Sequence, residues 1–202
     1  MSTDPRVFYG ERIPAQFNSA LEAQQALGEA GRRVYEAMRA VSATIRVEVE
    51  GCAAIHLNID AGQMQAADAP ARPPFLTLMQ DRRAFERIAR EAGDSAMALL
   101  GGLSGLAGEM RLTRSRVDNL ALVNGLVHFE VTGSDGFLLR THFGTGPIPD
   151  TPSTLIRVDE TAYRDLRSGK LDPQAAFMNQ QIVVEGDMQI AMQLALAAIA
   201  PD

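Results

Sequence analysis

The most informative segment of this chain runs from Leu166 to Met178 and reads Leu-Arg-Ser-Gly-Lys-Leu-Asp-Pro-Gln-Ala-Ala-Phe-Met. Ser168-Gly169 predicts a turn after a helix over Asp159–Leu166, because glycine adopts turn conformations with little strain. Residues 173–178 are expected to be helical. A strand at Gln181–Glu185 should follow, and then a last helix that begins after its cap, Asp187, and ends near Ile199.

Upstream of this stretch, alternating apolar residues predict strands. Leu120–Val123 and Leu126–Thr132 flank Asn124-Gly125, a pair typical of a type I′ hairpin turn. Gly133–Gly136 predicts a second turn that leads into a strand at Phe137–Phe143, which would make a three-stranded meander. A loop rich in Gly and Pro (144–153) then precedes a strand at Thr154–Val158.

The first half is less regular. We expect a loose N-terminal arm over residues 1–17 and a helix over 18–42. A β-hairpin should follow, with strands Thr44–Glu50 and Ala54–Asp60, and then a loop or poor edge strand over 61–74. Phe75–Met79 predicts a strand, and Asp81 should cap a helix that ends near Ala92. Residues 93–108 contain five glycines. We interpret them as a frayed helix with a weak strand, or as a flexible apolar loop near a ligand.

The two halves of the sequence echo each other in the same order. Val47–Gly51 aligns with Phe129–Gly133, and the pattern from Asp81 to Ile88 aligns with that from Asp159 to Leu166. In a third match, residues 108–112 align with residues 186–190. This echo indicates either a degenerate internal duplication or a shared secondary-structure pattern.

The chain also resembles a known family over residues 117–202, the sterol carrier protein-2 lipid-binding domain. The resemblance rests on the Gly169-Lys170-x-x-Pro173-x-x-Ala176-Phe177 spacing and on Ile182–Met192. It implies an α+β fold with a mainly antiparallel sheet of about five strands covered by helices. A tunnel between sheet and helices would bind fatty acyl chains, acyl-CoA or sterols. Gln180, Gln181 and Val183 stand where the family often has glycine and basic residues, so recognition of a CoA phosphate is not expected.

Composition excludes several functional classes. The chain has 202 residues, a net charge of −6 and 5% aromatic residues, which disfavours nucleic-acid binding. Its one cysteine, Cys52, excludes a disulfide framework. There is neither a signal-peptide pattern nor an apolar run of spanning length, so we expect a cytoplasmic protein.

The last helix is apolar nearly all round, with only Gln189 and Gln193 polar. Such a helix is buried in a core or dimer interface, or it lines a ligand tunnel. Flexible methionines suit an apolar pocket but also fill ordinary cores. We predict a ligand-binding set from this region and from the adjacent strands: Phe129, Phe143, Phe177, Met178, Ile182, Val184, Met188 and Met192.

Catalytic patterns are poor, and we predict no catalytic residue, metal site or cofactor. The histidines His56, His128 and His142 fall on predicted strands without a zinc-binding motif. Arginines cluster at 111–116 and 82–90, where they would steer an anionic lipid or form a solvated helix face.

We therefore divide the chain into an arm (1–17), an α+β half (18–113) and a sterol carrier-like half (114–202). The expected function is non-enzymatic binding and carriage of a hydrophobic ligand, with transient membrane contact. Three alternatives remain open: an accessory protein that presents an isoprenoid or quinone precursor to enzymes, an enzyme that acts on a tunnel-bound polyketide or isoprenoid, and a homodimer closed by the apolar helix.

Overall fold

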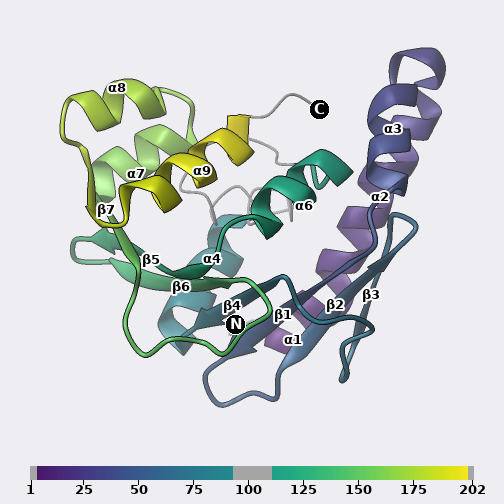
Figure 1. The fold of residues 1–202 in the computed structure, drawn as a ribbon, viewed down its shortest axis with the longest axis horizontal. Coiled ribbons are helices and arrows are strands. Elements are labelled where there is room, and N and C mark those ends of the chain that lie inside the picture. Colours follow the sequence, from purple (N-terminus) through teal and green to yellow (C-terminus); the bar gives the residue numbers. More distant parts are fainter. Residues whose placement is uncertain (1–3, 93–110, 200–202) are drawn as a thin grey trace.

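The computed structural model describes residues 4–92 and 111–199, and its centre is one eight-stranded sheet (Figure 1). The strand order is β3-β2-β1-β4-β6-β5-β7-β8. The strands are β1 (Ala43–Val49), β2 (Ile55–Asp60), β3 (Gln63–Ala67), β4 (Leu76–Gln80), β5 (Gly125–Thr132), β6 (Phe137–Phe143), β7 (Thr154–Asp159) and β8 (Ile182–Gly186).

The α+β class and the mainly antiparallel sheet are confirmed, but the expected strand number is wrong. Only the β1–β4 and β5–β7 pairs are parallel. The sheet has eight strands rather than about five because β4 of the first half pairs with β6 of the second. This antiparallel pairing joins the strands of both halves into one sheet, and a single hydrophobic core extends over both.

One side of the sheet, here called the helix face, carries Ile45, Leu78, Phe129 and Ile156, all of them buried. The helices pack on it. The other side is called the open face, and it carries Arg46, Thr77, His128 and Arg157 at alternate positions along the same strands. This alternation follows from the two-residue period of a β-strand. Figure 1 shows α7 (Glu160–Arg167), α8 (Pro173–Met178) and α9 (Met188–Ile199) on the same side of β5 and β7.

The N-terminal segment is not a loose arm, so that prediction is wrong. Pro5–Val7 forms α1, Phe8–Arg12 a π-helix η1, and Ile13–Ala26 helix α2. Phe8, Tyr9 and Phe17 are fully buried on the helix face. Burial of these large side chains stabilises the segment far more than its local propensity does. The predicted helix over 18–42 is interrupted at Gly28–Ala30 (η2), and α3 covers Arg32–Arg39.

The predicted hairpin around Asn124-Gly125 is also wrong. Arg114–Ala121 forms helix α6 instead of a strand. Val117 and Leu120, three residues apart, both face the core, and this spacing places them on one side of a helix. Gly125 has a φ of 141°, far from the type I′ value, and begins β5.

Most other predicted elements are confirmed. The structure contains the β1–β2 hairpin, the β5–β6 hairpin, an edge strand β3 within 61–74, and strand β4. Helix α4 (Arg82–Ala92) begins after its cap Asp81, and the order β7-α7-α8-β8-α9 is as expected. The glycine-rich stretch 93–108 lies outside the described residues.

Candidate functional site

Helix α9 has two apolar faces. Asp187 caps it, since its Oδ1 accepts hydrogen bonds from the backbone N–H groups of Gln189 (2.8 Å) and Ile190 (3.4 Å). Ile190 and Leu194 are buried against the sheet, and Ala197 extends the same stripe. On the outer side, methionine and leucine side chains at four-residue spacing are exposed: Met188, Met192 and Leu196. An apolar outer face is unusual for a surface helix.

Helix α8 and strand β8 also carry apolar residues that are exposed or half-buried. The Asp172 carboxylate caps α8 by accepting from the Ala175 N–H at 2.9 Å. Ala176 is buried, whereas Phe177 is 44% exposed and Met178 is 73% exposed. β8 is the edge strand of the sheet and lies next to both α8 and α9. On its helix side it carries two half-buried residues, Ile182 and Val184.

We name these residues the C-terminal apolar surface: Phe177, Met178, Ile182, Val184, Met188, Met192 and Leu196. Single exposed apolar side chains are ordinary in proteins, but a grouped set marks an interaction or ligand site. No charged residue occurs between 188 and 199, so no charge on α9 would oppose the burial of its outer face. The arrangement can hold an apolar molecule by contact.

Six of the eight predicted ligand residues lie on α8, β8 and α9: Phe177, Met178, Met188 and Met192 are exposed, and Ile182 and Val184 are partly buried against the core. Phe129 and Phe143 are instead fully buried, and the Phe129 ring packs against the Tyr163 ring with centroids 6.1 Å apart. The sequence reasoning missed Leu196. Its position four residues after Met192 was the available signal, since it lies on the same helical stripe.

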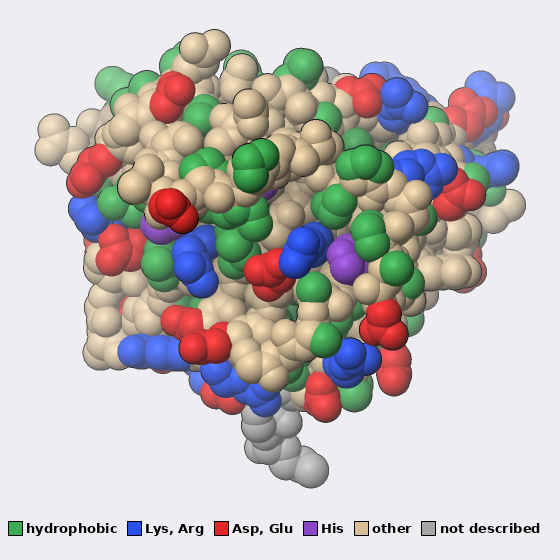
Figure 2. Space-filling view, turned by 60° about the horizontal axis from the view of Figure 1, so that its bottom comes forward, with side chains coloured by type: hydrophobic (Ala, Val, Ile, Leu, Met, Phe, Trp, Pro, Cys, Tyr) green, Lys and Arg blue, Asp and Glu red, His purple; other side chains and the backbone are tan. Residues whose placement is uncertain are grey.

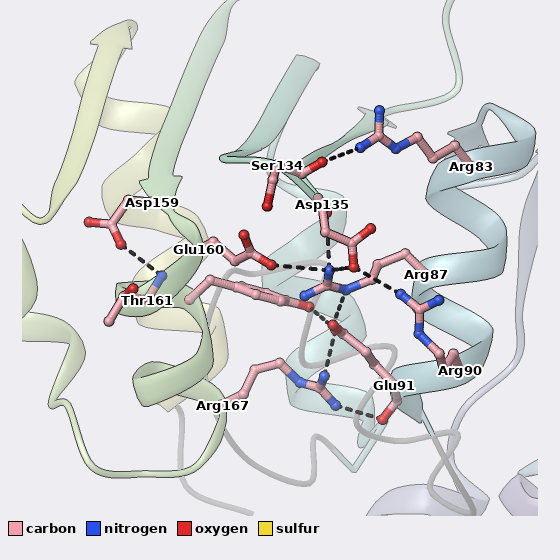
Figure 3. A network of polar contacts seen from close by, with 11 residues as sticks. Arg83, Arg87, Arg90, Glu91, Ser134, Asp135, Asp159, Glu160, Thr161 and Arg167 are labelled. Carbon is pink, nitrogen blue, oxygen red and sulfur yellow. Dashed lines mark hydrogen bonds and ion pairs between the residues drawn. The ribbon is translucent and has the colours of Figure 1, made fainter.

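A polar network joins α4 to α7 and to the β5–β6 turn (Figure 3). The Arg87 guanidinium contacts Glu91, Asp135 and Glu160, and its side chain is 11% exposed. Burial alone would lower the pKa of Arg87, but the hydrogen bond and charge of Glu91, aided by Asp135 and Glu160, raise it. Arg87 is therefore a fixed cation.

The Tyr163 hydroxyl belongs to the same network and donates to Glu91 at 2.9 Å. Burial, followed by the Glu91 charge, raises the pKa of Tyr163, so this hydroxyl stays protonated. Arg167 donates to the other side of the network, to a Glu91 carboxylate oxygen at 2.6 Å. Each acid of the network has a cationic partner. We therefore assign the network to the packing of α4 on α7.

All three histidines lie on the open face. Burial lowers the pKa of His142, and burial together with the Arg140 charge lowers that of His128. Two ring nitrogens, His56 Nδ1 and His128 Nε2, are buried without a hydrogen-bond partner. Figure 2 shows histidine side chains among hydrophobic, basic and acidic ones. Within residues 4–92 and 111–199, no cluster of His, Cys, Asp or Glu could hold a metal ion.

The arginine clusters have structural partners. Arg116 is buried and donates through Nε to the Ala197 carbonyl at 3.1 Å, so it joins α6 to the end of α9. Arg114 pairs with Asp118 on its own helix at 2.8 Å. Among the described helices, none is long and apolar enough to cross a membrane.

Comparison with known proteins gives one family and several similar structures. Residues 111–198 match the SCP-2 sterol transfer family. No curated protein matches the sequence. Similar solved structures include sterol carrier protein 2 like 2 of Aedes aegypti, at 15% identity over 38% of this chain and 74% of that one, with a TM-score of 0.30. Sterol carrier protein domain 2 of Helicoverpa armigera is 26% identical over 42% of this chain and 77% of its own, with a TM-score of 0.31.

A third similar structure is described as a UbiJ-SCP2 ubiquinone synthesis protein. It is 13% identical over 94% of this chain and 96% of its own, with a TM-score of 0.24. The family match includes α6 and every element from β5 to α9, and it therefore contains the whole C-terminal apolar surface. Over residues 111–198, the chain thus matches the SCP-2 sterol transfer family, as the resemblance over 117–202 predicted.

Proposed function

We propose that this protein binds a hydrophobic ligand at the C-terminal apolar surface and carries it without chemical change. The observation that carries the proposal is the outer face of α9, where Met188, Met192 and Leu196 are exposed within the segment that matches a sterol transfer family. The free energy of the system falls when an apolar partner covers exposed apolar area of this kind. The ligand class is a fatty acyl chain, a sterol or another lipid.

The expected affinity follows from the area that a lipid would bury. About ten methylenes at ~0.8 kcal/mol each give ~8 kcal/mol before ordering costs. This corresponds to roughly micromolar affinity at best, which permits both loading and release. Flexible thioether side chains, such as those of Met188 and Met192, adapt to ligands of different shape.

Native mass spectrometry of freshly purified protein, followed by denaturing extraction, tests this function. We expect a released mass in the lipid range. A quinone or isoprenoid mass instead of a fatty acid would favour the accessory role in presenting such precursors to enzymes. Protein that is ligand-free and also fails to bind a fluorescent fatty acid at tens of micromolar would contradict the proposal.

The variant Met192→Glu tests whether the ligand binds at the C-terminal apolar surface. A carboxylate in an apolar contact must lose its hydration, so this variant should weaken fluorescent fatty-acid binding at least about tenfold. Leu27→Glu is the matched control, because Leu27 at 58% and Met192 at 60% are similarly exposed. Leu27 lies after α2, in the first half. Equal losses in both variants would place the ligand elsewhere.

A further inference from the structure

The sheet contains two strand triplets with the same order and directions. The first is β2-β1-β4 and the second is β6-β5-β7. In each triplet the first strand in the chain forms an antiparallel hairpin with the next and a parallel pair with the third. Because β4 and β5 are both antiparallel to β6, the two triplets also point the same way.

Strand register agrees with the internal echo of the sequence. In the echo, Val47 aligns with Phe129, and Asp81 aligns with Asp159. Leu78 lies three residues before Asp81 and Ile156 lies three residues before Asp159, so these two residues are aligned as well. In the sheet, Val47 pairs with Leu78, and Phe129 pairs with Ile156. The same aligned residues therefore face each other in both parallel pairs, which shared secondary-structure preferences alone would not require.

The helices after the third strands are equivalent as well. The Asp81 carboxylate accepts from the Ala84 N–H at 2.6 Å, and that of Asp159 accepts from the Ala162 N–H at 2.9 Å. The next residues along the echo, Phe85 and Tyr163, are both buried on the helix face.

Beyond this shared part the two units differ. β7 of the second unit is followed by α7, α8, the edge strand β8 and α9, which form the C-terminal apolar surface. In the first unit, the place beside β4 that corresponds to β8 is taken by β6.

The helix face of the first unit is closed by the chain's own N-terminal segment. The Phe8 and Tyr9 rings pack on Phe85, with centroids 5.6 and 5.9 Å away. The Tyr9 hydroxyl and the Gln80 amide are hydrogen-bonded, 3.0 Å from oxygen to oxygen. Phe17 is also fully buried.

We infer that residues 43–92 and 125–167 are two copies of one sterol carrier-type unit, and that the first copy is closed by the chain's own residues 5–26. The chain therefore takes up one apolar ligand, at the second copy. The number and place of the bound ligand rest on the proposed function, whereas the closure of the first copy is independent of it.

Native mass spectrometry with oleate tests the stoichiometry. The wild type should bind one oleate per chain, and Met192→Glu should bind none at the same concentration. Two oleates per wild-type chain would overturn the inference. It would also be overturned if Met192→Glu retained one oleate and this oleate protected the amides of the first half from hydrogen exchange. No oleate on the wild type would contradict the proposed function instead.

Benzene tests the closure independently of any lipid. Phe8→Ala should leave an apolar cavity, so saturating benzene should raise its Tm, as benzene binds other dry cavities of this kind. Val7→Ala is the matched control, because Val7 is the adjacent residue and is half-exposed. Benzene should leave the Tm of Val7→Ala and of the wild type unchanged. Ile13→Ala replaces Phe8→Ala if the latter does not fold. Absence of stabilisation in the folded cavity variant would show that the segment does not fill the first copy.

Discussion

At the scale of single residues, Arg87 is a charged side chain whose loss should destabilise the fold. It contacts Glu91, Asp135 and Glu160, which come from α4, the β5–β6 turn and α7. Arg87→Gln leaves the mostly buried Glu91 and Glu160 with fewer cations, and we expect a loss of about 3 kcal/mol in the free energy of unfolding. Urea denaturation measures it.

The control for this prediction is Arg114→Gln. Arg114 and Asp118 form an exposed pair on one helix, 2.8 Å apart, and such pairs contribute less than about 1 kcal/mol. Similar losses in the two variants would mean that the Arg87 network stabilises the fold no more than a surface pair does.

The histidines of the open face predict a dependence of stability on pH. The folded pKa values of His128 and His142 lie below the ordinary 6.5, mainly because burial disfavours the charged ring. The neutral histidines therefore contribute fully to the free energy of unfolding above pH 6.5, and this contribution is lost as the pH falls through their pKa values in the folded state. We expect the free energy of unfolding to decrease between about pH 7 and pH 5.

The double variant His128→Gln/His142→Gln checks the assignment. It should flatten the pH dependence in this range, because glutamine does not titrate. A slope equal to that of the wild type would assign the effect to other groups.

At the scale of elements, the caps of α4 and α7 should contribute equally. Asp81→Ala and Asp159→Ala each remove a carboxylate that accepts backbone hydrogen bonds in the first helical turn. Each should lower the free energy of unfolding by about 1 kcal/mol. The conservative variants Asp81→Asn and Asp159→Asn keep an accepting oxygen and should cost much less. Thermal denaturation of all four variants tests this, and a loss in the asparagine variants as large as in the alanine variants would argue against the capping role.

At the scale of the whole molecule, the family match covers only residues 111–198, yet the sheet does not divide there. β6 pairs with β4 along five register positions, from Phe143 with Leu76 to Leu139 with Gln80. A fragment of residues 111–202 would expose this strand edge together with part of the core. Exposed apolar edges promote association, so the fragment should aggregate or dimerise rather than give a folded monomer.

Size-exclusion chromatography and circular dichroism of this fragment, beside the full chain, measure the effect. A monomeric fragment with a cooperative thermal transition would show that the second half folds independently.

Local sequence patterns were enough to predict the α+β class, the resemblance to a sterol carrier family over the C-terminal part, and most elements after Gly133. These elements carry local signals, such as the Gly133–Gly136 turn, the Asp159 cap and the charge-free stretch from Met188 to Ile199. Local signals are readable because they act between residues a few positions apart.

The remaining features follow from contacts between residues that are far apart in the chain. The N-terminal segment is helical because Phe8, Tyr9 and Phe17 become buried against strands far along the chain. Phe129 and Phe143 lie in the core because the hairpin register points them to the helix face. The sheet has eight strands because β4 and β6 pair across the two halves. These outcomes depend on contacts between distant residues, whose free energies no local pattern encodes.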